Sequence, residues 1–237
     1  TKEYSMYLKL SLLAMPLLTL STVSQAAVVD VSITNLTQGI YFTPLLVTAH
    51  TSDSHLFEVG KAASPALQAM AEGGAIADLV AIADGLSAVS AANPAAGLLA
   101  PSSYTMVSDL DTGSNNVLTI AAMMLPTNDG FVGKDSWAIP SEAGTYTFYM
   151  NGYDAGTEAN DEIVNGGGAS GVPGIPANPG ANGGTGGSGV SSSSANSNIH
   201  IHPGNVGDSD ISGGVIDHDS RIHRWLNPVA QVVVPVK

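Results

Sequence analysis

The chain has 237 residues, of which 20 are acidic and 7 are basic, so its formal net charge is −13 at pH 7. Nucleic acids and anionic lipid surfaces would repel such a protein, and we expect neither as a partner. The absence of cysteine excludes disulfides, thiolate catalysis and cysteine-ligated zinc. With 44% hydrophobic residues and 27 glycines, the composition favours one β-rich core with long connections.

The first 26 residues have the pattern of an export signal. Lys9 precedes the apolar run "LSLLAMPLLTL", and small residues at Ser24 and Ala26 mark a cleavage site after Ala26. The alternative is a retained apolar arm that docks into a neighbouring subunit. We therefore expect a secreted or cell-surface protein without a membrane span in its mature chain, with the periplasm as another location. Export without cysteine favours a bacterial source.

The mature chain opens with strand patterns and continues with helical ones. Hydrophobic residues alternate with polar ones in "VVDVSITNL", which predicts a half-buried strand. The segment 41–50 predicts a second strand, and Pro44 in it indicates an edge or a bulge. Ser64 followed by Pro65 is typical of a helix start, and helical spacing then continues to residue 85. We expect a helical insertion over residues 64–85.

Strand patterns return in the second half of the chain, at residues 116–125, 145–153 and 228–236. The first of these is mostly apolar, which predicts a central strand covered on both faces. Residues 87–101 and 124–137 are interpreted as loops because proline, glycine and polar residues interrupt them. Since the strands flank the helices rather than alternate with them, we expect an antiparallel β-sandwich with a short helical insertion.

Residues 165–198 are rich in glycine, serine and asparagine. Such a segment buries too little apolar surface to offset the entropy of ordering it, which predicts a mobile loop. Only about forty residues follow, and their last strand needs a sheet to join. Residues 27–237 are therefore interpreted as one domain.

Acidic residues gather where the expected strands end. Asp129 follows the strand 116–125, and Asp154 follows the strand 145–153. If both strands run in the same direction, both loops meet at one end of the sandwich. Ca²⁺ prefers carboxylate, carbonyl and water oxygens, so converging acidic loops indicate a calcium site. The alternative is that these are ordinary turn residues on a solvated surface.

A third acidic segment, "SDLDTGSNN", precedes the strand 116–125 and adds Asp109 and Asp111 as candidate ligands. No segment was found to match the EF-hand pattern of alternating acidic residues before a glycine, and Gly156 breaks it in "YDAGTEANDE". The spacing alone therefore leaves both the site and its ligand set open.

The stretches "PTNDGFVGKDS" and "YDAGTEANDE" resemble the spondin domain, the amino-terminal module of F-spondin and mindin. "VSITNLT", "TPLLVTAH", "LFEVGKAASPALQAMAEGG" and "NPVAQVVV" fit the same pattern in order, so the resemblance spans nearly the whole mature chain. It is closest to cysteine-free bacterial members. The resemblance implies a C2-like antiparallel β-sandwich with Ca²⁺ at one edge, and a role in adhesion or matrix interaction.

Under this resemblance, Asp129 and Asp154 correspond to two calcium ligands of the family. Its third acid falls near Leu110 here, so Asp109 or Asp111 would have to take its place. The chain also departs from the animal domains by having no cysteine, Gly130 in place of tryptophan, and no thrombospondin-type repeat. These departures argue against transferring animal receptor or immune functions.

Histidines form a second candidate cluster. His200 and His202 share one face if their segment is extended, and His218 and His223 follow later. Two such segments with a carboxylate would bind zinc or copper if they met. The alternative is a solvated polar loop, and the sequence does not fix the distance between the segments.

The sequence therefore predicts an exported calcium-binding protein that acts as a cell-surface, matrix or filament component. Its expected partners are extracellular macromolecules, or further copies of itself joined through the apolar arm or the last strand. The alternative is a hydrolase that uses a metal-activated water at the acidic edge. No G-x-S-x-G nucleophile motif supports that alternative, and aromatic residues for sugar stacking are few.

Overall fold

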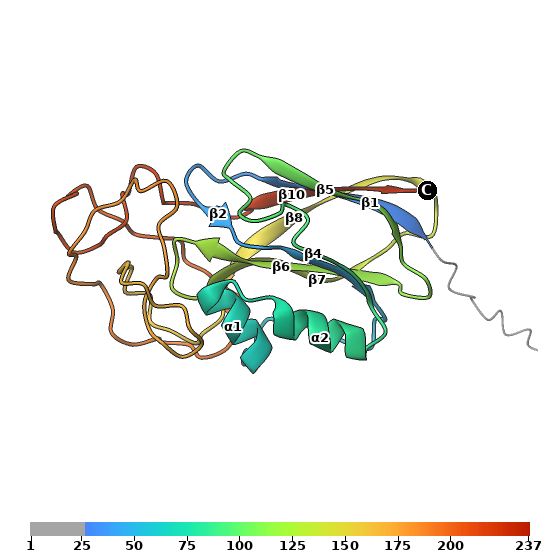
Figure 1. The fold of residues 1–237 in the computed structure, drawn as a ribbon, viewed down its shortest axis with the longest axis horizontal. Helices are drawn as coiled ribbons and strands as arrows, with labels where there is room; N and C mark the ends of the chain where they lie inside the picture. Colours follow the sequence, from blue (N-terminus) through green and yellow to red (C-terminus); the bar gives the residue numbers. More distant parts are fainter. Residues whose placement is uncertain (1–26) are drawn as a thin grey trace, which may run out of the picture.

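The computed structural model describes residues 27–237, so the expected export segment lies outside the described residues (Figure 1). Residues 27–237 form mainly antiparallel strands and two short helices. In chain order the elements are β1 (Val28–Asn35), β2 (Tyr41–Phe42), β3 (Leu46–His50), α1 (Pro65–Gly73), α2 (Ala77–Gly85), β4 (Val89–Ala92), β5 (Tyr104–Asp111), β6 (Val117–Leu125), β7 (Gly130–Ala138), β8 (Gly144–Asp154), β9 (His200–Ile201) and β10 (Ala230–Val236).

The strands form a nearly closed sheet in the order β4-β3-β6-β7-β8-β10-β1-β5, and every pair in it is antiparallel. The sheet folds over so that its two halves face each other as two layers (Figure 1). The main hydrophobic core lies between these layers, with Ile33, Phe42 and Val232 fully buried in it. The predicted mainly antiparallel β-sandwich is confirmed.

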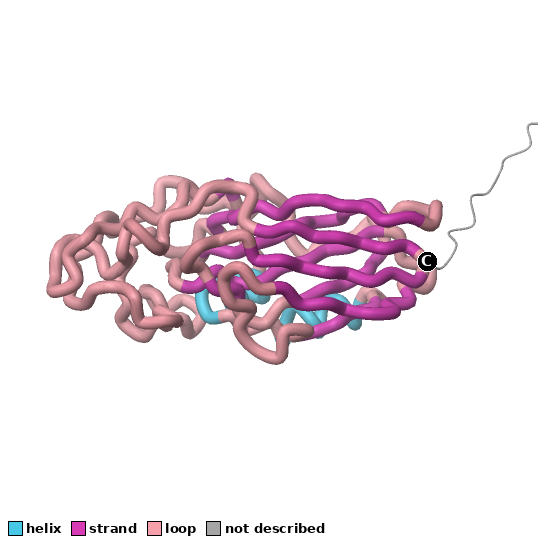
Figure 2. The backbone as a smooth tube through the Cα atoms, turned by 90° about the horizontal axis from the view of Figure 1, so that it is seen from above, coloured by secondary structure: helices cyan, strands magenta, loops and turns pink. Residues whose placement is uncertain are grey.

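The two helices lie against the β6 side of the sandwich (Figure 1). They cover a second hydrophobic cluster that includes Leu67, Met70 and Phe131. No helix of the described residues covers the layer formed by β8, β10, β1 and β5, and its strands face the viewer in Figure 2 with the helices behind them. None of the helices in residues 27–237 is long and apolar enough to cross a membrane.

Local sequence explains where α1 begins and ends. The Ser64 hydroxyl accepts a hydrogen bond from the backbone N–H of Leu67 (3.2 Å), and Pro65 occupies the first turn. Gly74 ends the helix in the left-handed conformation (φ 73°), which glycine adopts without steric penalty. The predicted helical insertion over 64–85 thus matches the two helices closely.

The strand predictions succeed in part. The 116–125 segment forms β6, and all nine residues of β6 are buried, as expected for a strand covered on both faces. The segment 41–50 is divided between β2 and β3, with Pro44 in the break. β3 pairs with β4 and β6, so of the two alternatives given for Pro44, an edge or a bulge, the edge is wrong, and Pro44 lies at an interruption of the strand.

Two segments interpreted as loops are wrong as well. Residues 89–92 form β4, and residues 130–138 form β7, which pairs with β6 on one side and β8 on the other. The glycine and charged residues of β7 do not give the sequence pattern of a strand. Gly133 has a packing role there, because a Cβ atom at this position would lie 2.8 Å from Phe57 Cζ.

Residues 155–229 form an irregular cap at one end of the sandwich, at the left of Figures 1 and 2. Apart from β9, this irregular cap consists of turns and isolated bridges, such as the one between Val164 and Ile175. Its glycine-rich part is hydrogen-bonded to neighbouring loops, and Ile175 within it is fully buried. The expected mobility of residues 165–198 stays a prediction.

Candidate metal centre

Topology brings Asp129 and Asp154 to the same end of the sandwich. β6 and β8 both pair antiparallel with β7, so they run in the same direction and end on the same side. Gly130 stands opposite Asp154 in the β7–β8 register, and the Ala155 N–H donates to the Asp129 carbonyl (3.2 Å). The two acidic loops therefore meet next to the irregular cap.

The Asp129 side chain is fully buried, and only one of its oxygens is satisfied. Oδ2 accepts hydrogen bonds from the N–H groups of Thr157 (2.7 Å) and Glu158 (3.1 Å), and from Thr157 Oγ1 (3.2 Å). Oδ1 has no hydrogen-bond partner. A buried carboxylate oxygen without a partner is costly, and a cation would satisfy it.

Asp154 is also buried, with 2% of its surface exposed. Its Oδ1 accepts from the Gly156 N–H (2.8 Å), and its Oδ2 accepts from Asn160 Nδ2 (2.7 Å). Gly156 has φ 72°, and a Cβ atom there would lie 2.6 Å from the Ser197 carbonyl carbon. The predicted tight turn beside Asp154 therefore requires glycine.

Buried carboxylates at this end of the sandwich have raised pKa values. Burial, and then the charge of Asp154, raise the pKa of Asp129 to about 6. Burial also raises the pKa of Glu158 to about 7, with smaller contributions from the charges of Glu72 and Asp129. Glu158 Oε1 is a second buried carboxylate oxygen without a partner.

The structure does not bring Asp109 and Asp111 to this site. Both lie on β5, where Asp111 pairs with Val28, and Asp109 accepts a hydrogen bond from Lys237 Nζ (2.6 Å). They precede β6, whereas Asp129 follows it. The nine residues of β6 separate its two ends by roughly 27 Å at about 3.4 Å per residue. The third ligand expected from β5 therefore lies at the opposite end of the sandwich.

Within residues 27–237, no group of three or more histidine, aspartate or glutamate side chains is gathered so that it could hold a metal ion. Asp129 and Asp154 are a pair, and a calcium ion bound by them would take its other ligands from main-chain carbonyls and water. Ca²⁺ commonly combines these oxygen donors. The donor set therefore fits a hard cation.

The four histidines divide between two places. His200 Nε2 lies 3.7 Å from Asp154 Oδ2. His202, His218 and His223 are buried in the irregular cap near Glu162, so the interpretation of a solvated loop is wrong for these three. Sequence reasoning singled out all four residues, but it could not place segments that no regular element connects.

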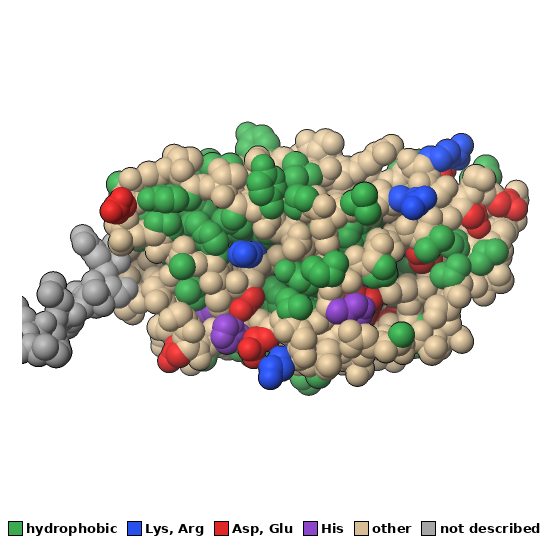
Figure 3. Space-filling model, turned by 180° about the vertical axis from the view of Figure 1, so that it is seen from behind, with side chains coloured by type: hydrophobic (Ala, Val, Ile, Leu, Met, Phe, Trp, Pro, Cys, Tyr) green, Lys and Arg blue, Asp and Glu red, His purple; other side chains and the backbone are tan. Residues whose placement is uncertain are grey.

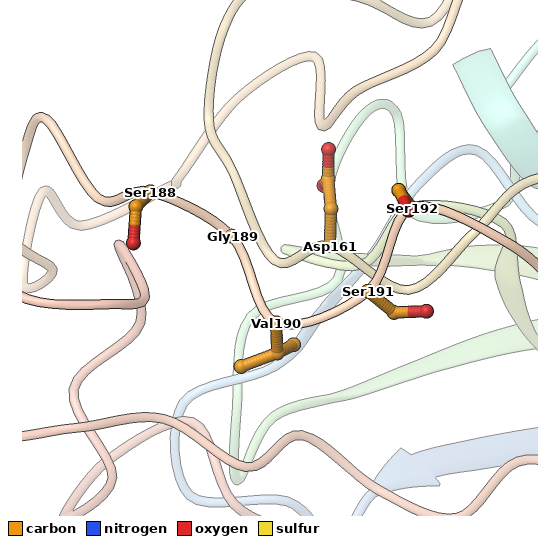
Figure 4. A pocket seen from close by; sticks show the side chains of 6 residues that line it. All are labelled: Asp161, Ser188, Gly189, Val190, Ser191 and Ser192. Atoms are coloured by element: carbon orange, nitrogen blue, oxygen red, sulfur yellow. The ribbon is translucent and has the colours of Figure 1, made fainter.

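A surface pocket lies beside this acidic segment, lined by Asp161 and residues 188–192 (Figure 4). The Asp161 carbonyl accepts from the Val190 N–H (3.3 Å), and its side chain accepts from Asn128 Nδ2 (2.8 Å). The Ser188 and Ser191 side chains point away from the Asp161 carboxylate (Figure 4). These side chains form no nucleophile–base pair of the kind a hydrolase would use.

The fold and this site define a class: an antiparallel β-sandwich with a helical insertion and two buried aspartates where its acidic loops meet. A family model described as Spondin_N matches residues 34–163, more than half of the chain, and the chain belongs to this spondin N-terminal domain family. The match includes Asp129 and Asp154 but ends before most of the irregular cap. A comparison with curated proteins finds no match.

Proposed function

We propose that this protein binds Ca²⁺ at Asp129 and Asp154 and acts outside the cell as a surface, matrix or filament component. The observation that carries the calcium proposal is the pair of buried aspartates, with Asp129 Oδ1 lacking any partner. In this proposal the ion is structural. It neutralises two loops that otherwise repel each other, and it fixes the irregular cap against the ends of β6 and β8.

The role outside the cell is supported by the family, whose members are typically extracellular. The surface also favours contacts with other molecules. Tyr149, Gln231, Thr34 and Tyr104 stand in one row across β8, β10, β1 and β5, and 71% of the Tyr104 surface and 52% of the Tyr149 surface are exposed. Figure 3 shows a further face on which patches of hydrophobic side chains lie between charged ones.

Thermal unfolding with and without a chelator tests the calcium proposal. Calcium at a hundredfold excess over its Kd should raise the Tm by about 5–10 °C, because a ligand that binds only the folded state stabilises it. Asp154→Ala should abolish the difference between calcium and chelator. Asp111→Ala is the matched control, and it should retain the difference because Asp111 lies at the other end of the sandwich. A wild-type Tm that does not respond to calcium contradicts the proposal.

A further inference from the structure

Three of the six histidines of the chain are buried together in the irregular cap, beyond the part that the family model matches. His202, His218 and His223 have 4%, 1% and 0% of their surfaces exposed. Histidine is polar and is the side chain that gains charge between pH 5 and 8, so such burial requires an explanation.

All three histidines lie near the Glu162 carboxylate, and His202 and His223 are each also near a second one, Asp154 and Asp219 respectively. The two oxygens of Glu162 accept the backbone N–H groups of Val206 (2.6 Å) and Gly207 (3.0 Å), which ties residues 206–207 to the acidic segment. His218 Nδ1 lies 3.5 Å from Glu162 Oε2, and the ring centroids of His218 and His223 are 5.4 Å apart. The interior of the cap is therefore a polar cluster of imidazoles and buried carboxylates, in which Glu162 contacts His218.

Hydrogen bonding fixes where the protons of two of these rings lie. His202 Nδ1 accepts the Gly204 N–H (3.0 Å), and His223 Nδ1 accepts the Asp219 N–H (3.0 Å). A neutral imidazole carries one N–H, so in both rings the proton is on Nε2. Both Nε2 atoms are buried without a partner, and so are both ring nitrogens of His218.

This arrangement does not suit a transition metal. A metal bound at Nε2 needs the lone pair of that nitrogen, which is protonated in His202 and His223. The zinc or copper site considered from the sequence is therefore not supported by the hydrogen bonding of these rings. A second proton on His202 or His223 would have to go on Nδ1 and break the hydrogen bond from the backbone N–H, whereas His218 Nδ1 has the Glu162 carboxylate 3.5 Å away.

We propose that His218 and His223, packed around Glu162, form an acid-sensitive latch that holds the irregular cap closed at neutral pH and releases it on acidification. Protonating both rings places two positive charges side by side against one carboxylate. Asp219, the other carboxylate near His223, already forms a two-point ion pair with Arg221 (2.9 and 2.6 Å). His202 adds a third imidazole that interacts electrostatically with His218.

The direction of the pH dependence follows from burial. Desolvation, and then the neighbouring His218, lower the pKa of His223 to about 4 from an ordinary value of 6.5. A base whose pKa is lower in the folded state stabilises the fold above its unfolded pKa, and this contribution is lost as the pH falls. The latch should therefore weaken between about pH 6.5 and pH 4.

Trp225 is a built-in reporter of the latch. It lies where the cap meets the main hydrophobic core, its ring centroid is 5.1 Å from that of His202, and only 8% of its surface is exposed. The other tryptophan, Trp137, is stacked on Phe148 in the sandwich. Replacing it by Trp137→Phe leaves the fluorescence of Trp225 alone to follow opening of the cap.

The experiment is a titration of Trp225 fluorescence from pH 7.5 to 3.5 in the Trp137→Phe protein, with and without the double change His218→Asn and His223→Asn. Asparagine at 223 places an oxygen near the position of Nδ1 and so keeps an acceptor for the Asp219 N–H. In the double histidine variant we expect the pH midpoint of cap opening to be at least about 0.5 unit lower than in the Trp137→Phe protein, and the transition to be less steep. His55→Asn, at an exposed site beside Asp135, is the control and should leave the midpoint unchanged.

An unchanged midpoint in the double variant overturns the proposal, because the opening would then depend on carboxylates alone. If that variant does not fold, the ring resonances of the wild-type histidines decide by NMR. The latch requires His223 to stay neutral until the cap opens. Protonation of the His223 ring near pH 6.5 in the closed protein contradicts it.

Discussion

Different interactions hold the sandwich and the irregular cap. Between the sandwich layers lie apolar side chains such as Ile33, Leu118 and Val232, all fully buried. In the cap, buried carboxylates accept backbone N–H groups instead: Asp217 accepts those of Val164 (2.9 Å) and Gly187 (2.8 Å). A glycine-rich chain that buries few apolar side chains can thus be organised around charges, and its stability should depend on pH.

The largest expected effect is in the sandwich. Phe42 is fully buried in the main core, and Phe42→Ala should lower the free energy of unfolding by about 3–5 kcal/mol through lost burial and a residual cavity. Urea denaturation followed by circular dichroism measures this. Tyr104→Ala, on the uncovered face, is the matched control and should change stability by less than about 0.5 kcal/mol. Equal effects of the two changes would contradict the assignment of the core.

In the cap, the Asp217 carboxylate should stabilise the structure as Phe42 does in the sandwich. Asp217→Ala removes the acceptor of two partly buried backbone N–H groups, which costs about 1–3 kcal/mol. We expect this loss to appear as faster protease cleavage within residues 165–198, with little change in the unfolding of the sandwich. The control variant Asp210→Ala, changed at an exposed turn, should be cleaved by the protease at the wild-type rate. A cleavage rate unaffected by Asp217→Ala would show that the cap does not depend on this carboxylate.

The stability contributed by Asp129 and Glu158 should depend on pH in the opposite direction to that contributed by the histidine latch. Asp129 and Glu158 have raised pKa values, of about 6 and about 7, so in the metal-free protein their contribution to stability is present below pH 4 and is lost as the pH rises through these values. Calcium should remove this loss by neutralising the carboxylates. Melting temperatures measured in chelator between pH 5 and 8, with Glu158→Gln for comparison, should show the decline reduced in the variant. A decline identical in Glu158→Gln and wild type would assign it to other groups.

The smallest effect is expected at the far end of the sandwich. Asp109 and Asp30 form exposed ion pairs with Lys237 Nζ (2.6 and 2.8 Å), and such pairs contribute about 0–1 kcal/mol. Asp109→Asn should therefore change stability slightly and leave the response to calcium intact. Loss of the calcium response in this variant would mean that the β5 acids participate in the site after all.

The sandwich could be predicted in outline because its strands carry their own signals. Alternation at Val29, Val31 and Ile33 and the buried run of β6 both reflect the faces that those strands cover. β7 could not be predicted, since it begins at a turn and contains Gly133, whose small size suits the packing of Phe57 rather than any local preference. Its conformation is set by its two neighbouring strands.

The residues of the candidate site could be predicted only where the direction of the strands determines which acidic residues meet. Asp129 and Asp154 follow parallel-running strands and meet, whereas Asp109 and Asp111 precede β6 and cannot reach them. The histidine cluster depends on contacts between distant loops of the cap, for which the sequence has no periodicity. Burial and charge in that region become visible only in the fold.

Calcium titration by isothermal calorimetry, with Asp129→Asn beside the wild type, tests the central proposal most directly. Asparagine keeps the shape of the side chain and an oxygen that can still accept from Thr157, but removes the charge that Ca²⁺ would neutralise. We predict one calcium ion bound per wild-type chain and affinity lowered at least about tenfold, or 1.4 kcal/mol, in Asp129→Asn. Absence of calcium binding to the wild-type protein, or equal affinity in the two proteins, would contradict a calcium site at Asp129 and Asp154.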